Sequence, residues 1–190
     1  MKNKVGGWKQ KSTEVMYENP WIEVTHQEVV RPNGSEGIYG VVHFKGTAVG
    51  VLPIDEEGNT WLVRQSRYTL NAYTWEIPEG GAKEGEDPKV TAGRELEEEI
   101  GICARNIREL MRMHLSNSVT DELAVVYIAE DLYPGTQQLE VTEDIEFKKL
   151  PLQEAVEMVK RGEITDAISV AALLRVALDE AASGKLQGKR

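Results

Sequence analysis

Carboxylate side chains are concentrated in one short stretch of this chain of 190 residues. Asp87 and Pro88 suit the start of a helix, and Gly101 suits its end, so the sequence predicts a helix between them. The segment from residue 79 to residue 102 carries eight acidic side chains against three basic ones. The eight are Glu79, Glu84, Glu86, Asp87, Glu95, Glu97, Glu98 and Glu99.

Three of these carboxylates fall on one side of the predicted helix. At 3.6 residues per turn, Glu95, Glu98 and Glu99 share an arc of about 100°. Such neighbours repel one another, and a hard divalent cation is the compensating charge that carboxylate oxygens prefer. A solvated acidic face is the alternative, but the glycine-rich loop 80–85 would let the backbone approach an ion or a phosphate closely. The apolar stripe expected to face the core is Ala92, Leu96 and Ile100.

The segments around this helix are expected to be mostly strands. Because the strands come in runs with few helices between them, the pattern favours a mixed sheet covered by helices over a doubly wound parallel sheet. We expect a hairpin formed by residues 48–54 and 60–67. We also expect frayed ends at residues 1–11 and 184–190. The other expected strands are 13–17, 21–31, 38–44, 75–77, 107–114, 123–129 and 144–150, and the later helices are 152–161 and 166–182.

Composition limits the classes of function. The chain is 41% hydrophobic and 28% charged, which suits one globular domain with room for a small sub-lobe. Its formal charge of -10 argues against general binding to nucleic acid or to anionic membranes. The single cysteine, Cys103, excludes an internal disulfide framework and fits a reducing compartment. With neither a membrane-length apolar run nor a secretory signal at the start, we expect a soluble cytoplasmic protein.

The carboxylate segment also matches a known signature. Gly80, five residues, Glu86, seven residues and then residues 94–102 fill every fixed position of G-x5-E-x7-R-E-U-x-E-E-x-G-U, where U is a bulky aliphatic residue. The chain therefore resembles the Nudix hydrolases. This signature, the Nudix box, occupies residues 80–102. The resemblance implies an α/β/α sandwich with a central mixed sheet at 47–183. An N-terminal antiparallel β-sheet sub-lobe at 1–46 would mediate dimerisation, and 184–190 would be a polar tail.

The resemblance also implies a reaction and a metal. Members of this family hydrolyse a nucleoside diphosphate linked to another group, with Mg²⁺ or Mn²⁺ as cofactor. Glu95, Glu98 and Glu99 match the metal-binding carboxylates, and the residue before the box glycine, here Glu79, would add its backbone carbonyl. Arg94 and Glu86 match positions that hold the loop to the helix.

A general base for the attacking water is expected from one of two places. It is either a glutamate of the box, such as Glu98, or an acid from a later loop, where Glu143 ranks before Glu140. The stretch Glu143-Asp144-Ile145 resembles that of ADP-ribose hydrolases. A solvated loop acid remains the alternative for Glu143 and for Glu140.

Segments outside the box resemble the branch that acts on ADP-ribose and nucleotide sugars. Residues 64–68 and 75–78 carry this similarity, and it assigns Arg67, and secondarily Arg64, to the phosphates and Glu76 to the vicinity of the metals. Trp21, or else Tyr39 or Trp75, would stack on the base. Glu122 keeps an acid typical of ADP-ribose hydrolases, whereas Asn117 stands where they have proline. Members of this branch also form homodimers.

Four functions follow from these observations. The first is hydrolysis of nucleoside diphosphate sugars such as ADP-ribose, ADP-glucose and UDP-glucose, which the departure at Asn117 favours over strict ADP-ribose specificity. Strict ADP-ribose hydrolysis is the second. The third is a house-cleaning enzyme for nucleoside triphosphates, against which the N-terminal strands and Arg67 argue. The fourth is a sensor without activity, against which the complete set of box glutamates argues.

Overall fold

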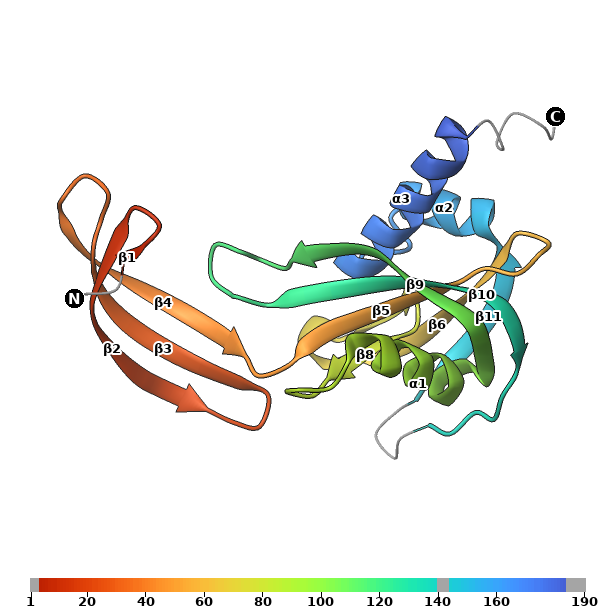
Figure 1. Cartoon of the computed structure of the whole chain (residues 1–190), viewed down its shortest axis with the longest axis horizontal. Helices are drawn as coiled ribbons and strands as arrows, with labels where there is room; N and C mark the ends of the chain where they lie inside the picture. The colour runs from red at the N-terminus through yellow and green to blue at the C-terminus, as the bar shows by residue number, and fades with distance from the viewer. Residues whose placement is uncertain (1–3, 140–143, 184–190) are drawn as a thin grey trace. The chain divides into compact units, whose positions relative to one another are not determined.

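The computed structural model describes residues 4–139 and 144–183 (Figure 1). Its contacts divide the chain into two compact units. The first unit contains residues up to Thr47 together with His114–Leu123, and the second contains Ala48–Met113 and the chain from Ala124 onward. The candidate carboxylate helix belongs to the second unit.

The first unit is the expected antiparallel sheet, with strands in the order β1-β2-β3-β4. The prediction of a frayed segment at 1–11 is wrong for the residues described, because strands begin at Lys4 and Trp8. Gly6 has a φ of 58°, which lets the chain turn tightly and pair Val5 with Trp8. The strands are β1 (Lys4–Val5), β2 (Trp8–Glu18), β3 (Ile22–Val30) and β4 (Glu36–Phe44).

Residues His114–Leu123 complete the first unit by binding to β4. The amide of Val42 donates to the carbonyl oxygen of Val119 at 2.9 Å, and His43 Nδ1 lies 2.7 Å from a carboxylate oxygen of Asp121. Tyr39 Oη donates to the carbonyl oxygen of Ser118 at 2.6 Å. These bonds explain why a segment so far along the chain belongs to the first unit.

The second unit contains two sheets. One has the order β8-β5-β10-β9, and the other has the order β11-β6-β7. Strands β5 and β10 run parallel, with Ala48 opposite Ala124, whereas β6 pairs antiparallel with both of its neighbours, so this unit combines the two strand orientations as expected. The strands are β5 (Thr47–Pro53), β6 (Asn59–Arg67), β7 (Ala72–Glu76), β8 (Glu79–Ala82), β9 (Ile102–His114), β10 (Leu123–Pro134) and β11 (Glu146–Pro151).

Two expectations about these strands need correction. The predicted hairpin of 48–54 with 60–67 does not form, because β5 and β6 belong to different sheets although one turn joins them. The glycine-rich loop contains a short strand, β8, and β10 extends to Pro134, past the end of the strand expected at 123–129. Hydrophobic alternation identified the strands, but it does not reveal which strands pair.

Three helices cover the sheets of the second unit. Helix α1 (Pro88–Ile100) lies on one side, and α2 (Leu152–Lys160) and α3 (Ala167–Ala182) lie on the other (Figure 1). A 3-10 turn, η1 (Tyr68–Leu70), follows β6. Helix α3 packs closely on β5, since a Cβ on Gly50 would lie 2.6 Å from Cγ2 of Ile168. Fully buried side chains from several of these elements include Leu52, Leu62, Ile77, Leu96, Met158 and Leu173.

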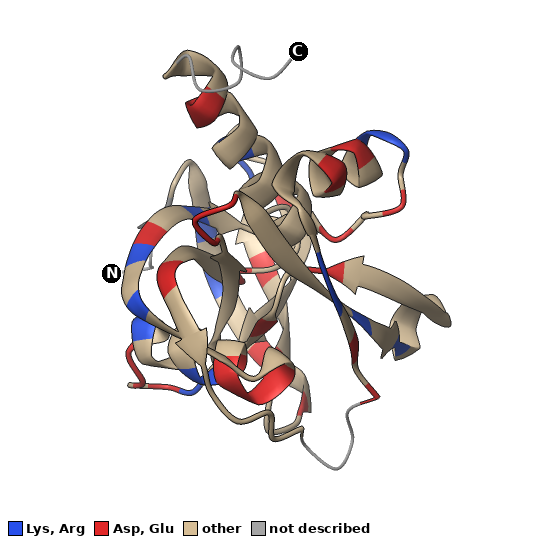
Figure 2. Ribbon diagram, turned by 90° about the vertical axis from the view of Figure 1, so that its right-hand side faces the viewer, with Lys and Arg blue, Asp and Glu red and all other residues tan. Residues whose placement is uncertain are grey.

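The surface is acidic on average. Asp and Glu number 32 against 22 Lys and Arg, and Figure 2 shows the acidic stretches on helices, strands and loops alike. Among the described residues, none of the helices has the length and apolar character needed to cross a membrane.

Candidate active site

The carboxylate helix has the boundaries that its sequence predicts. Asp87 caps its start by accepting a hydrogen bond from the amide of Lys89 at 2.9 Å, and Gly101 ends it with a φ of 66°. The stripe Ala92, Leu96 and Ile100 is buried as expected. Helix α1 is therefore fixed at both ends and along its apolar face.

Two of the box glutamates are buried against strand β8. The exposed fraction is 6% for Glu95 and 1% for Glu99. The amide of Glu79 donates to Oε2 of Glu99 at 3.2 Å. A Cβ on Gly80 would overlap the Glu95 carboxylate, so any larger residue here would displace this carboxylate.

Arg94 binds the other side of the carboxylate group. Its Nη2 lies 2.7 Å from Oε1 of Glu95, and its Nη1 donates to Oε2 of Glu98 at 2.7 Å. The expected contact of Arg94 with Glu86 is a long one of 4.0 Å, while Glu86 accepts a hydrogen bond from the amide of Lys83 at 3.0 Å. Arg94 thus orients two carboxylates of the box more closely than it holds the loop.

Arg67 joins the same region from strand β6. Its Nη2 forms ion pairs with Glu76 and with Glu79, and its Nε donates to the Glu76 carboxylate at 3.0 Å. Thr74 Oγ1 also donates to Glu76, which is 2% exposed. Burial acts to raise the pKa of Glu76, but the hydrogen bonds from Arg67 and Thr74 outweigh it and hold this pKa below its usual value.

Glu79 combines burial with an unsatisfied oxygen. Its Oε2 is buried and has no hydrogen-bond partner among the described residues. Burial and the negative charge of Asp166 raise its pKa well above the usual value, against the opposing charge of Arg67. A buried carboxylate with a free oxygen is a group whose missing partner is a proton or a cation.

The residues present fit a hard divalent cation. The backbone of Glu79, the glycine at position 80 and the buried carboxylates Glu95 and Glu99 meet where α1 faces β8. Within residues 4–139 and 144–183, however, no three His, Cys, Asp or Glu side chains are already arranged as a metal site. Arg94 and Arg67 hold several of these carboxylates instead.

The predicted substrate residues do not all gather here. Arg64 lies on β6 with Arg67, but an odd spacing puts the two on opposite faces of the strand. Its Nη1 lies 3.4 Å from Glu146 and its guanidinium lies 4.9 Å from the centre of the Tyr73 ring. A phosphate role for Arg64 therefore stays a prediction, without support from its contacts.

Trp21 and Glu122 belong to the first unit, where the Trp21 side chain is 72% exposed and Glu122 is partly buried. Glu140 and Glu143, the expected bases, lie outside the described residues. The residue after them, Asp144, accepts a hydrogen bond from Tyr73 Oη at 2.8 Å. The roles of all four predicted residues remain predictions.

Sequence reasoning missed the part of the site that comes from the start of α3. Thr165 and Asp166 line a small cavity together with Arg67 and Thr74. Asp166 was recognisable only as a helix cap, which it is, since Oδ2 accepts a hydrogen bond from the amide of Ser169 at 2.7 Å. No local pattern indicates that this cap lies near β6 and β7.

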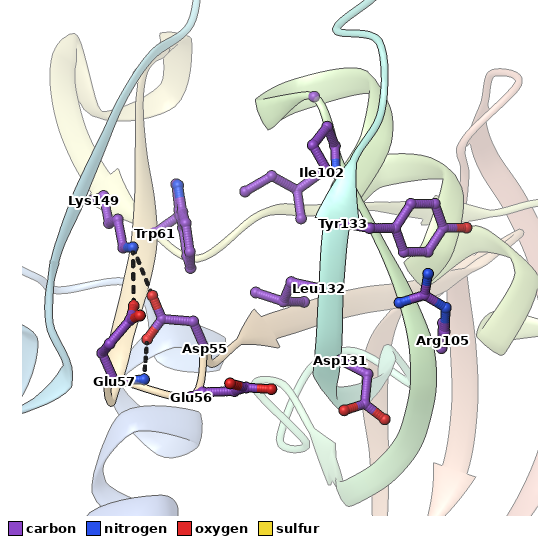
Figure 3. Close-up of a pocket in the computed structure, with 12 residues that line it drawn as sticks. Asp55, Glu56, Glu57, Trp61, Ile102, Arg105, Asp131, Leu132, Tyr133 and Lys149 are labelled. Atoms are coloured by element: carbon purple, nitrogen blue, oxygen red, sulfur yellow. Dashed lines mark hydrogen bonds and ion pairs between the residues drawn. The ribbon is translucent and has the colours of Figure 1, made fainter.

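A separate cavity of about 780 Å³ shares none of these residues (Figure 3). On one side Lys149 Nζ lies 4.9 Å from the centre of the Trp61 ring and 2.6 Å from Asp55. On the other side Arg105 lies 4.8 Å from the centre of the Tyr133 ring. Because none of the glutamates of the signature lines this cavity, it is not the candidate catalytic site.

Comparison with known proteins gives consistent matches. The profile of the NUDIX domain matches residues 44–173, and that of the nucleoside diphosphate sugar hydrolase N-terminal domain matches residues 8–42. The chain is 33% identical over 170 residues to the ADP-ribose pyrophosphatase of Bacillus subtilis (strain 168), covering 88% of this chain and 91% of that protein.

Two further matches cover most of the chain. Identity to the methanol dehydrogenase activator of Bacillus methanolicus is 33% over 175 residues, or 91% of this chain and 94% of that protein. A crystal structure of ADP compounds hydrolase has a TM-score of 0.84 at 21% identity, with 96% of this chain and 98% of the other covered. This last likeness shows the shared fold.

Proposed function

Because this chain belongs to the NUDIX domain family, we propose that it hydrolyses the diphosphate linkage of nucleoside diphosphate sugars in a metal-dependent reaction. The chain is a Nudix hydrolase, and the proposal concerns its substrates and its metal. ADP-ribose, ADP-glucose and UDP-glucose are the substrates proposed, and a nucleoside monophosphate and a sugar phosphate are the products. The observation that carries the proposal is the burial of Glu95 and Glu99 against Glu79 and Gly80.

The substrate class is supported from outside the box. Residues 8–42 match the N-terminal domain of nucleoside diphosphate sugar hydrolases, and a relative of 33% identity is named ADP-ribose pyrophosphatase. Strict ADP-ribose hydrolysis remains the second candidate because of that relative. The asparagine at position 117, where ADP-ribose hydrolases commonly have proline, favours the broader specificity.

The chemistry requires neutralisation of the diphosphate, placement of a water and removal of its proton. Glu95, Glu98 and Glu99, with the backbone carbonyl of Glu79, would hold Mg²⁺ or Mn²⁺, which supplies positive charge to the non-bridging oxygens. Arg67 would add a second positive charge, since its Nη1 donates to none of the described residues.

Removal of the water proton needs a carboxylate with a free lone pair near the phosphate. Glu143 is the first candidate for this base and Glu140 the second, both on sequence grounds. Replacing Glu143 by Gln should lower kcat far more than it raises KM. A rise in KM with kcat unchanged would remove Glu143 from this role.

We also propose that the protein is a cytoplasmic homodimer joined through the N-terminal sheet. Large apolar side chains of this sheet are exposed in the single chain, among them Met16 at 62% and Ile38 at 67%. Light scattering of the purified protein would give the mass directly. The mass of a dimer is expected, and Met16→Lys should shift it toward the monomer if this face is the interface.

A substrate panel tests the proposed function. Phosphate released after coupling to a phosphatase would be measured for ADP-ribose, ADP-glucose, UDP-glucose, GDP-mannose, NADH, diadenosine polyphosphates and dNTPs, with Mg²⁺ or Mn²⁺ and with EDTA. Comparable rates on several nucleotide sugars, abolished by EDTA, are expected. Activity on ADP-ribose alone would establish the strict specificity, and preference for dNTPs would overturn the proposal. Binding without any turnover would identify a sensor.

A further inference from the structure

A cavity of about 210 Å³ opens beside Arg67, between β6, β7 and the start of α3. Most of its lining is polar and comes from three separate parts of the chain. The lining residues that matter here are Arg67, Thr69, Thr74, Glu76, Thr165 and Asp166. Thr165 and Asp166 belong to no motif of the family signature, so the signature assigns this cavity no role.

The charges of this lining indicate what it accepts. Arg67 is its one cation among the described lining residues, and Glu76 and Asp166 are its two carboxylates. An additional phosphate inside the cavity would meet this net negative charge and be repelled. Threonine hydroxyls and carboxylate oxygens instead suit the hydroxyl groups of an uncharged polyol.

Asp166 has an oxygen to spare for such a ligand. Its Oδ2 accepts the hydrogen bond from the amide of Ser169, and its Oδ1 accepts none from the described residues. Glu76 differs, because its carboxylate already accepts bonds from Arg67, Thr74 and Gln65. Asp166 is therefore the carboxylate of the cavity that is available to a ligand hydroxyl.

The size and position of the cavity fit one part of a larger substrate. Pockets for whole drug-sized ligands usually measure roughly 300–1,000 Å³, so about 210 Å³ suits a single sugar ring. Arg67 lines the cavity and also pairs with Glu79, whose backbone amide donates to Oε2 of Glu99 at 3.2 Å. A diphosphate bound by the carboxylates and by Arg67 would therefore have its attached group next to the cavity that Arg67 lines.

We infer that this cavity is the subsite for the sugar ring of the substrate, and that Asp166 and Thr165 select the sugar by hydrogen bonds to its hydroxyl groups. The inference rests on the proposed function and adds to it the residues that determine sugar specificity. It also assigns the nucleoside half to a different part of the protein.

Asp166→Asn is the sharpest test. Asparagine caps helices as well as aspartate does, so α3 keeps its start, but the atom facing the cavity changes from an acceptor to a donor. The matched control is Asp179→Asn, which removes a charge from the same helix, where Asp179 pairs with Arg175 at 2.9 Å. Thr165→Val is a second variant of nearly equal size.

Two readouts separate a sugar subsite from a general defect. With Mg²⁺ present, Asp166→Asn should weaken inhibition by ribose 5-phosphate and lower kcat/KM for ADP-ribose about tenfold, the usual worth of a hydrogen bond to a charged group. Inhibition by AMP should change less than about twofold, since AMP carries no second sugar. Thr165→Val should alter the ratio of kcat/KM between ADP-ribose and ADP-glucose, and Asp179→Asn should alter none of these quantities.

The outcomes distinguish a failure of the proposed subsite from a failure of the proposed function. If the parent protein turns over nucleotide sugars but Asp166→Asn affects AMP and ribose 5-phosphate equally, or affects neither, the subsite is wrong and the proposed function stands. If the parent turns over no nucleotide sugar, the proposed function falls and the subsite falls with it. Melting temperatures of the variants within a few degrees of the parent show that an altered rate or inhibition does not come from unfolding.

Discussion

Gly80 and Glu95 lie so close that a Cβ on residue 80 would overlap the carboxylate of the glutamate. The first position of the signature is thus glycine because of a side chain fifteen residues later, which comes from the next helix. The loop and the helix of the signature are therefore two sides of one contact. This relationship gives the first of four predictions.

Gly80→Ala should displace the Glu95 carboxylate and lower kcat/KM by at least about tenfold, as expected when a metal ligand is moved. The free energy of unfolding should change little, because the obstructing atom is the end of a flexible side chain. Gly81→Ala is the matched control, since a Cβ there meets nothing within 4 Å. Equal activity of the two variants would show that Glu95 tolerates displacement.

Glu99→Gln and Glu98→Gln should each lower kcat by more than about tenfold, because a metal ligand loses its charge. Glu97→Gln on the same helix is the control, since its Oε1 serves as an acceptor for the amide of Thr136 and an amide oxygen can replace it. Steady-state kinetics at saturating Mg²⁺ measure the effect. Retention of turnover within about tenfold by both variants would remove these residues from the metal site.

Glu76→Gln should lower the free energy of unfolding by about 1–3 kcal/mol, because the buried partner of Arg67 loses its charge while Arg67 itself stays partly exposed. Urea denaturation measures this difference. Glu146→Gln is the control. Glu146 pairs with Arg64, which lies on the same strand as Arg67, but the Glu146 side chain is 70% exposed. Its loss should change the free energy by less than about 0.5 kcal/mol. Equal effects would contradict the importance of burial.

Asp55 should make stability depend on acid pH. Burial acts to raise its pKa, but the hydrogen bonds from Lys149 and Asn59 outweigh it and lower the pKa to about 2. Because the folded pKa lies below the unfolded one, the stabilisation is complete above about pH 4 and is lost as the pH falls toward 2. Asp55→Asn should remove about 1–2 kcal/mol at pH 7 and flatten the curve between these values. Urea denaturation at several pH values measures the free energy of unfolding of both proteins. If its dependence on pH were the same in Asp55→Asn as in the parent, the lowered pKa of Asp55 would be contradicted.

Local signals predicted helix α1 completely, because its cap, its proline, its apolar stripe and its final glycine all act within a few residues. The same holds for β3 and β4 of the N-terminal sheet, whereas β1 and the start of β2 lie in a segment that was predicted to be frayed. The hairpin expected of 48–54 with 60–67 was wrong for a different reason. Strand pairing depends on partners such as β10, which are distant in the sequence.

The candidate site, too, could be predicted only in part from the sequence. The box glutamates and Arg67 follow from spacing and from the resemblance, and the structure adds their mutual contacts. Arg64 was predicted beside Arg67, yet its position on the opposite face of β6 gives it different partners, Glu146 and Tyr73. Asp166 was missed because only the tertiary fold brings the start of α3 to Arg67.

The parallel pairing of β5 with β10 also governs when the site forms during synthesis. Ala48 and Ala124 face each other in this pair, and β8 and α1 lie in the chain between them. When the ribosome has made only about the first hundred residues, the whole signature exists, but β5 still lacks its neighbour β10. Pairing across so long a separation is slow, and an open strand edge is prone to aggregation. The nascent chain therefore carries its catalytic signature for some time before it has an enzyme's active site.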